Sequence, residues 1–436
     1  MSKVNMMSAK DKKKGSLVPR LRFPEFNGEW RSQPLGELAF IIKEKAGDRK
    51  CILMSIMSGV GLIPQIDKFG KEIAGQQYKN YIILHKNDFA YNKSSTKEYP
   101  EGFIAMYIGT EIAAVPNSIF TCFKIKVADI AHLYLNYLFL YNFHGKYLRR
   151  YITIGARSHG ALAIDDADLL SLPIPYPTGN TSFKEQQRIA DCLSSLDERI
   201  AAETNKLDAL KAHKKGLLKQ LFPAEGETLP QLRFPEFQDA GEWVRKKVHQ
   251  IAKIYKGKGI SKADISSDGK QLCIRYGELY TLYSEVILEV ISKTSLPADN
   301  LFLSKVNDVI IPSSGETKID IATSSCVMKD DVALGGDLNI IRACQNGIFI
   351  SYYFNGNLKE EIAKKAQGDT VVHLYPSQID QLDIAIPSKK EQQRIADCLS
   401  SLDELITAQS QKIELLKDHK KGLMQQLFPR IDEVRA

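Results

Sequence analysis

The stretch KEQQRIADCLSSLDE occupies residues 184–198 and recurs unchanged at residues 390–404. The match extends without a gap, so that 29 of 40 positions are identical between residues 184–223 and 390–429. A repeat of this length and period indicates that a whole unit was duplicated, because solenoid repeats are much shorter.

Matched segments also precede each copy. LRFPEFNGEW at residues 21–30 returns as LRFPEFQDAGEW at residues 232–243, whereas the segments 45–170 and 258–380 look unrelated. The chain therefore consists of two units of roughly 200 residues, a size typical of one domain with its connections. Each unit has a matched head, a different middle and a matched tail.

The matched tails predict two long helices. Gly216 is the one glycine between residues 184 and 222, no proline lies there, and Pro223 and Pro429 end both helices at matching positions. Apolar residues recur in alternating steps of four and three, which is the seam of a coiled coil. The seam residues are Ile189, Leu193, Leu196, Ile200, Leu207 and Leu210 in the first copy, and Ile395, Leu399, Leu402, Ile406, Ile413 and Leu416 in the second.

The two helices are expected to pair with each other. A narrow apolar stripe on a helix about 58 Å long needs a partner helix. The second unit begins within ten residues of Pro223, so the second helix must run back antiparallel to the first. Glu203 and Gln409 interrupt the seam at the two midpoints, and we expect them to meet near an approximate twofold axis and to fix the register. The alternative is that both side chains extend into water.

The two middles combine helical and strand patterns. Strands are predicted at residues 80–92, 118–127, 303–313 and 348–354, and a helix at 131–151. Each middle carries Asn-Asp before an apolar run and a Ser-rich loop, at Asn87-Asp88 and Asn307-Asp308, which suggests a shared fold. The predicted fold class is α+β, with two mixed α/β domains joined by two long antiparallel coiled-coil helices in a pseudo-twofold internal repeat.

Composition describes an ordinary globular chain of 436 residues with a formal net charge of +7. No apolar run is long enough to span a membrane, and the lysine-rich start lacks the apolar region of a signal peptide. The seven cysteines form no CxxC pair, which is typical of reduced thiols in the cytoplasm. Much of the positive charge lies in the first 19 residues, so only local basic clusters would argue for nucleic acid.

Motifs for catalysis are missing from the sequence. No Walker A loop, GxSxG or HExxH occurs, and the histidines lack metal-ligand spacing to the cysteines. We interpret His213 and His419 as parts of a solvated helix face, and the acids of the repeat, Asp197 and Asp403 among them, as the polar face of a seam helix. We therefore predict no catalytic residue, no metal and no cofactor bound by this chain, and expect a binding and scaffolding protein.

The order of the motifs resembles the DNA-specificity subunit of bacterial type I restriction-modification systems. That order is LRFPEF…GEW, a variable segment, and KEQQRIADCLSSLDE…HKKGLLKQLF, and it then repeats with HKKGLMQQLF, from about residue 18 to residue 429. The first unit has four more residues than the second before its helix, which departs from full symmetry. The resemblance implies that the middles are target-recognition domains, each reading one half of a split, asymmetric site in double-stranded DNA.

The same resemblance implies the partners. The helices would set the spacing of the half-sites and dock two methyltransferase subunits, and motor/nuclease subunits would join them. S-adenosylmethionine, ATP and Mg²⁺ would belong to these partners, so the chain itself would be non-catalytic. The competing hypothesis is a cytosolic two-domain coiled-coil scaffold that binds protein or small ligands.

The expected organisation has seven parts. They are a disordered basic tail at 1–17, target-recognition domain 1 at 18–183, spacer helix 1 at 184–222, a linker at 223–231, target-recognition domain 2 at 232–388, spacer helix 2 at 389–429 and a tail at 430–436.

Candidate DNA-binding residues lie in loops. Phosphate contacts supply affinity and side chains in the major groove read bases, so we expect basic and small polar residues after the Asn-Asp strands. The first set is Lys93, Ser94, Ser95, Thr96 and Lys97, and in the second middle Ser313, Ser314, Glu316, Thr317 and Lys318. The second set is Arg149, Arg150, Arg157, Ser158 and His159, and in the second middle Lys256, Lys258 and Lys262. The alternative for each is an ordinary solvated surface residue.

Overall fold

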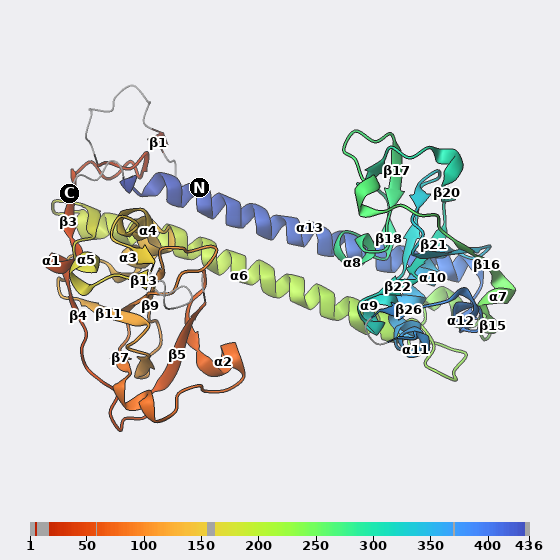
Figure 1. Ribbon diagram of the computed structural model, residues 1–436, viewed down its shortest axis with the longest axis horizontal. Helices are drawn as coiled ribbons and strands as arrows, with labels where there is room; N and C mark the ends of the chain where they lie inside the picture. Colours follow the sequence, from red (N-terminus) through yellow and green to blue (C-terminus); the bar gives the residue numbers. More distant parts are fainter. Residues whose placement is uncertain (1–4, 7–16, 58, 155–161, 369–370, 432–436) are drawn as a thin grey trace. The chain divides into compact units, whose positions relative to one another are not determined.

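The chain folds into two compact units in a computed structural model, which describes residues 5–6, 17–57, 59–154, 162–368 and 371–431 (Figure 1). The first unit comprises residues 1–202 and 413–436, and the second comprises residues 203–412. Each unit therefore contains one middle domain and one half of each long helix.

The two long helices are α6, Ser182–Gln220, and α13, Lys389–Leu427, each of 39 residues. Their bounds differ by two residues or fewer from the predicted ones. Within the second unit, Lys214 contacts Asp403 and Glu203 contacts Gln409, so later residues of α6 face earlier residues of α13. The pairing is antiparallel there, as predicted.

The described residues of the first unit form two four-stranded sheets besides shorter two-stranded ones. One has the order β4-β11-β8-β9 and is antiparallel throughout, and the other has the order β6-β5-β10-β7 with β5 and β10 parallel. The bounds are β4 Ala39–Ile41, β11 Phe120–Ile125, β8 Phe89–Asn92, β9 Phe103–Met106, β6 Gly61–Pro64, β5 Ile52–Met57, β10 Ala113–Val115 and β7 Ile82–Leu84.

The second unit repeats this topology with different residues. Its sheets have the orders β16-β25-β21-β23-β18 and β19-β17-β24-β20, again with one parallel pair, β17 with β24, in the second sheet. The bounds are β16 Ala252–Lys256, β25 Leu338–Ala343, β21 Asp308–Pro312, β23 Ser325–Val327, β18 Val286–Ile287, β19 Lys293–Thr294, β17 Gln271–Ile274, β24 Ala333–Leu334 and β20 Phe302–Leu303. The suggestion that the unrelated middles share a fold is confirmed, and the edge strand β18 is an addition of the second unit.

Several of the other elements also correspond between the units, whereas β12 of the first and β22 and α9 of the second have no equivalent in chain order. In the first the other elements are β3 Trp30–Pro34, α1 Leu35–Leu38, α2 Gln65–Phe69, α3 His132–Leu140, α4 Phe143–Leu148, β12 Thr153–Ile154, β13 Leu162–Ala163, α5 Asp166–Leu170 and β14 Pro173–Pro177. In the second they are β15 Val244–Lys247, α7 Val248–Ile251, α8 Glu278–Thr281, β22 Ser314–Gly315, α9 Lys318–Ile321, α10 Gly347–Tyr353, α11 Lys359–Lys365, β26 Val372–His373, α12 Pro376–Asp380 and β27 Asp383–Ile386. The matched heads enter as β3 and β15, which pair with β14 and β27 just before the long helices begin.

The strand predicted at residues 348–354 is wrong, because this segment is the helix α10. Its aromatic and β-branched residues favour a strand by propensity, but the Asn346 side chain accepts the N–H of Phe349 and caps a helix. Phe349, Tyr352 and Phe354 are fully buried, so tertiary packing overrides the local preference. The predicted helix at 131–151 is confirmed as α3 and α4, which are separated by Asn142 with φ of 57°.

The structure differs in detail from the predictions for two strand segments and for the N-terminal tail. The segments 80–92 and 303–313 each break at the Asn-Asp pair, where Asn87 (φ 74°) and Asn307 (φ 80°) turn the chain in the left-handed region. The tail expected to be disordered falls largely outside the described residues. Within it, Asn5–Met6 forms β1 and pairs with β2, Leu21–Arg22, so the prediction is wrong for these two residues. Such pairing needs only backbone groups and no apolar side chains.

The long helices are part of each core rather than separate from it. Ile189 and Leu193 of α6 and Leu427 of α13 pack among the aromatic residues of the first unit. Ile395 and Leu399 of α13 pack in the core of the second unit in the same way. Burial of such side chains contributes about 1.5–3 kcal/mol each, which ties each domain to its helix halves.

Candidate functional site

The matched heads and tails meet in a buried polar cluster in each unit. In the first unit, Glu185 accepts hydrogen bonds from Arg22 (2.7 and 2.8 Å) and from the indole N–H of Trp30 (3.3 Å). Glu185 is only 1% exposed, and such a buried carboxylate is stable only when it is fully paired.

The second unit repeats this cluster. Glu391 accepts from Arg233 (2.8 and 2.8 Å) and from Trp243 (3.2 Å), and it is also 1% exposed. We call the two Arg–Glu–Trp clusters the clamps. The sequence repeat therefore preserves an ion pair between segments more than 150 residues apart, a contact that the spacing of the motifs alone did not reveal.

The glutamine after each clamp glutamate holds the domain's first core helix. Gln186 accepts the N–H of Ala131 (2.9 Å) before α3, and Gln392 accepts the N–H of Asn346 (3.0 Å) before α10. Both amides are fully buried. The segment Glu-Gln-Gln of the repeat therefore connects each long helix to its variable middle through these hydrogen bonds.

The acids of the repeat have partners as well. In the first unit Asp197 accepts from Tyr137 (2.8 Å) and from Lys420 (2.5 Å). Asp197 is half-exposed on the polar side of α6, and Lys420 of α13 is its partner there.

The second unit has the equivalent arrangement. Asp403 accepts from Tyr352 (2.6 Å) and pairs with Lys214 (2.6 Å), which also reaches Glu285 (2.9 Å). Burial raises the pKa of Asp403, and its bonds to Lys214 and Tyr352 counter that shift. Lys214 and Lys420 are therefore the partners of the repeat's own aspartates.

The midpoints of the helices meet as predicted. The Gln409 amide donates to the backbone carbonyl (2.9 Å) and to the carboxylate (2.7 Å) of Glu203, and Lys412 pairs with the same carboxylate (2.6 Å). Glu203 is 9% exposed and Gln409 is 6% exposed, so the alternative of free extension into water is wrong. Six predicted seam residues are only half-buried: Leu196, Ile200, Leu207, Leu210, Ile406 and Leu416.

Loops from several strands converge at one edge of the second domain. The N–H of Lys258 donates to Leu334 O (3.0 Å), and the N–H of Ser313 donates to Asp337 O (2.8 Å). The predicted residues Lys258 and Ser313 therefore both contact one segment, residues 334–337, and Lys256 and Ser314 lie close to them along the chain. We call this region the second loop edge.

The first domain has a corresponding edge. The N–H of Lys93 donates to Ile119 O (2.8 Å), and the carbonyl of Lys93 accepts from Leu162 (2.8 Å). Ser94 and Thr96 line a cleft of about 850 Å³ together with the amides Asn92 and Asn117. We call this region the first loop edge; the polar side chains that line its cleft include these amides and hydroxyls and also Lys68.

The other predicted contact residues vary in their surroundings. Arg150 stacks on the ring of Tyr147, 4.0 Å from its centroid. The segment that contains Arg157, Ser158 and His159 lies outside the described residues. The exposed residues are Lys97, Lys262, Glu316, Thr317 and Lys318, whereas Ser95 is half-buried. All of these residues remain predictions.

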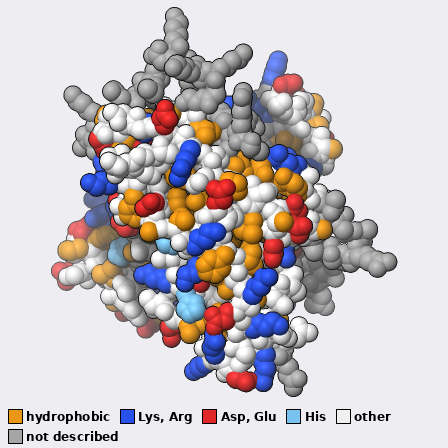
Figure 2. All heavy atoms as spheres, turned by 90° about the vertical axis from the view of Figure 1, so that its left-hand side faces the viewer, with side chains coloured by type: hydrophobic (Ala, Val, Ile, Leu, Met, Phe, Trp, Pro, Cys, Tyr) orange, Lys and Arg blue, Asp and Glu red, His pale blue; other side chains and the backbone are white. Residues whose placement is uncertain are grey.

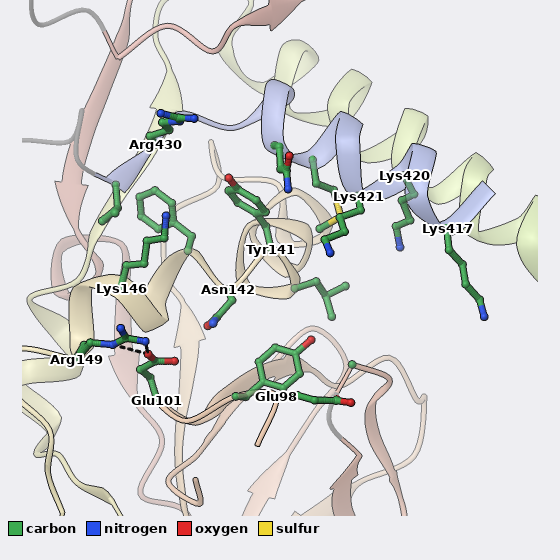
Figure 3. A pocket seen from close by; sticks show the side chains of 17 residues that line it. Glu98, Glu101, Tyr141, Asn142, Lys146, Arg149, Lys417, Lys420, Lys421 and Arg430 are labelled. Carbon is green, nitrogen blue, oxygen red and sulfur yellow. Dashed lines mark hydrogen bonds and ion pairs between the residues drawn. The ribbon is translucent and has the colours of Figure 1, made fainter. Parts of the chain in front are cut away.

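A cavity of about 690 Å³ lies in the first unit between α4 and the last turns of α13 (Figure 3). Arg149 on one wall is bonded to Glu101 (Nε–Oε1 2.7 Å), so its guanidinium already has a carboxylate partner. The opposite wall carries the lysines of α13. The basic residues that line the cavity are Lys146, Arg149, Lys417, Lys420, Lys421 and Arg430.

The outer face of the first unit has a mixed surface. Figure 2 shows Lys and Arg side chains interspersed with acidic and hydrophobic ones, without one continuous basic patch among the described residues on this face. Recognition of an anionic polymer by this face would therefore depend on particular side chains rather than on a general positive field.

Arg275 is a residue of the second loop edge that the sequence patterns did not identify. It follows β17 directly, and the carbonyl of the preceding Ile274 accepts the N–H of Gly335 (2.9 Å). In the sequence, Arg275 follows an apolar strand and begins the polar segment Arg275-Tyr276-Gly277. A polar segment also follows the second Asn-Asp strand, and this shared arrangement could have identified Arg275 as a loop residue.

No cluster of three or more His, Cys, Asp or Glu side chains that could hold a metal is found among the residues that the structure describes. The described helices also include none that is long and apolar enough to cross a membrane.

Comparison with known proteins gives consistent matches. The family model of the type I restriction modification DNA specificity domain matches residues 27–212 and again 240–418. The proposed specificity subunit of type I restriction enzyme MjaX from Methanocaldococcus jannaschii is 23% identical over 372 residues, which cover 83% of each chain. The type I restriction enzyme MjaVIII specificity subunit of the same organism is 23% identical over 313 residues, covering 66% of this chain and 69% of the relative.

Two solved structures have the same fold. A chain from a structural study of complex assembly and conformational transition of the type I R-M system aligns with a TM-score of 0.57 and 17% identity, covering 93% of this chain and 99% of that one. The type I restriction-modification system S subunit from M. genitalium aligns with a TM-score of 0.53 and 13% identity, covering 94% and 99%.

Proposed function

Because the chain belongs to the family of type I restriction modification DNA specificity domains, we propose how its two units divide the work of recognition. The chain is a specificity subunit of a type I restriction-modification system, and its two domains recognise a bipartite site. We propose that each domain reads one half of the site through its own loop edge, the first around Ser94 and Asn117 and the second around Lys258 and Ser313.

One observation carries this proposal. The clamps and the buried glutamines are the same in both units, and the strand orders agree apart from the added β18, whereas the residues along the two loop edges differ. A common frame with two different edges is what an asymmetric, split site requires, because each half presents different base edges in the major groove. Base contacts would specify the sequence, and lysines such as Lys97 and Lys318 would contact phosphates.

The identical parts of the helices support a proposal about partners. In both copies of the repeat the same side chains are exposed, for example Gln187 and Gln393, Ser195 and Ser401, and Glu198 and Glu404. Two equal surfaces suit two copies of one partner, and we propose that they dock two methyltransferase subunits. The continuous helices would set the spacing of the half-sites.

The remaining chemistry would come from the partners. Methyltransferase subunits would carry S-adenosylmethionine, and motor/nuclease subunits would use ATP and Mg²⁺. The chain would act in the cytoplasm, where bacterial and archaeal DNA is found. Its own residues would position DNA and would take no part in bond making.

Sequencing of methylated adenines tests the proposal. Cells that express the methyltransferase subunits with this chain are expected to modify a motif of two specified halves, separated by unspecified bases. Cells without the chain serve as the control and should lack that motif. Methylation that is identical with and without the chain would contradict the proposal.

A further inference from the structure

Arg275 has an unusual environment for a half-buried arginine. Its Nε is buried and has no hydrogen-bond partner among the described residues. Among the described residues, the carboxylate of Glu278 lies 3.9 Å from the guanidinium and is its ion-pair neighbour. That carboxylate is already bonded to the N–H of Arg275 (2.7 Å) and to the hydroxyl of Ser292.

Other arginines of the second unit have closer carboxylate partners than Arg275. Arg233 and Arg342 each make two bonds of 2.6–2.8 Å to one carboxylate, and Arg394 donates to Glu236 at 3.1 Å. A guanidinium without such bonds loses hydration and gains little in exchange. The side chain of Arg275 is 27% exposed, so its outer nitrogens are accessible to a partner from outside.

Arg275 lies where the loops of the second loop edge converge. An added Cβ on Gly335 would lie 3.5 Å from the Cα and 3.7 Å from the Cγ of Arg275, so Arg275 is in contact with segment 334–337. That same segment receives the N–H groups of Lys258 and Ser313. An added Cβ on Gly257 would lie 2.0 Å from Gly335 O, so only glycine allows this approach of the loops.

Aromatic side chains follow Arg275 directly. Tyr276 is 37% exposed, and its ring lies 6.2 Å from that of Tyr280 in an edge-on arrangement. The Tyr280 hydroxyl approaches the carbonyl of Ser314 (3.4 Å). One arginine, two tyrosines and the serine loop thus form one continuous surface, flanked by Lys256 and Lys258.

We propose that Arg275 reads a guanine in the half-site of the second domain; this rests on the proposed function. Two parallel N–H groups of a guanidinium match the O6 and N7 acceptors that guanine presents in the major groove. The carboxylate of Glu278 on the backbone N–H fixes the loop that carries the arginine. The flanking lysines attract the adjacent phosphates.

The first loop edge has a different residue at the equivalent position. Ile274 pairs with Leu334 in the second domain as Leu53 pairs with Ala114 in the first. Met54 therefore takes the place of Arg275, and it is buried and apolar. The guanine contact is specific to the second domain, so only one half of the site should depend on it.

The experiment replaces Arg275 and sequences methylated adenines in cells with the methyltransferase subunits. The wild-type motif is expected to contain a guanine that R275A no longer specifies, with discrimination against other bases reduced about 10- to 100-fold at this position. The other half of the motif should be unchanged. R275K keeps the charge without the parallel donors and should relax the same position.

R245A is the matched control. Arg245 is exposed on β15, whose partner is β27 and not the sheets of the loop edge, so this variant should keep the full motif. A wild-type motif without guanine in one half would overturn the Arg275 assignment while leaving the proposed function intact. So would an R275A variant that methylates the same motif uniformly less, since that result indicates a phosphate contact. Failure of the proposed function is distinct, because no motif would then depend on the chain. If R275A does not fold, R275K decides.

Discussion

The two units have the same polar frame around different interiors. Both clamps have equal geometry, and Asp197 and Asp403 each bind a tyrosine and a lysine. By contrast, the aspartate of the Asn-Asp motif is paired with an arginine in the second domain and lacks such a partner among the described residues of the first. The contacts between the long helices and each domain were therefore preserved after duplication, whereas charged residues inside the domains differ.

The Asn-Asp motif gives the clearest difference. Asp308 is 1% exposed and is bonded to Arg342 through both carboxylate oxygens (2.7 and 2.6 Å). Asp88 occupies the same position, but the residue at the place of Arg342 is the exposed Lys124. One oxygen of Asp88 is buried and has no hydrogen-bond partner in the described part of the chain, and burial raises the pKa of this carboxyl.

Replacement of each aspartate of the Asn-Asp motif by asparagine is expected to affect the two units differently. D308N leaves Arg342 without its carboxylate and is expected to destabilise β21 and β25 by about 3 kcal/mol. D88N is expected to leave β8 and β11 as stable as before, or more stable, at pH 7. The raised pKa of Asp88 means that its stabilising contribution exists below the unfolded pKa and is lost as pH rises through the folded value.

Hydrogen exchange of the amides in these strands measures both effects in the full chain. A loss of about 3 kcal/mol corresponds to roughly a hundredfold faster exchange. Equal acceleration by D88N and D308N would contradict the stated difference between the units.

Sequence patterns predicted the parts of the fold that depend on periodicity. The long helices, their antiparallel pairing and the contact of Glu203 with Gln409 followed from heptad spacing and the connection lengths. The helix α10 was missed because its capping residue and burial override the strand propensity of its aromatic residues. The clamps and Arg275 were missed because they depend on contacts between segments distant in sequence, which periodicity does not report. The choice of base-reading residues remains a set of predictions.

The second prediction uses a histidine that the second unit lacks. His144 is fully buried in the first unit, with one bond to Gly102 O (3.3 Å), and burial lowers its pKa to about 4. The described histidines of the second unit are exposed. Because the folded pKa is below the unfolded value, stability is present at neutral pH and is lost as pH falls from about 6.5 toward 4.

The expected loss is about 2 kcal/mol between pH 7.5 and pH 5, from that shift in proton affinity. Exchange rates in β8 and α4 should rise over this interval relative to those in β21 and α11. H144Q keeps a donor for Gly102 and should remove this difference in pH dependence. An unchanged profile in H144Q would assign the acid sensitivity to other groups.

Lys214 and Lys420 occupy equivalent places in the two units, and the expected difference between their variants is the smallest of the effects that we propose. Lys214 pairs with Asp403 and Glu285, whereas the described partner of Lys420 is Asp197 beside an open cavity. K214M removes a cation from two partly buried carboxylates, and K420M removes one from a half-exposed carboxylate. We expect K214M to destabilise its unit by about 1 kcal/mol more than K420M, since exposed pairs contribute little.

Salt should weaken the effect of K420M more than that of K214M, because exposed pairs are screened more strongly. Thermal unfolding with exchange at residues 207–218 and 413–424 measures both, and equal effects at all salt concentrations would show that Glu285 adds nothing to the second unit.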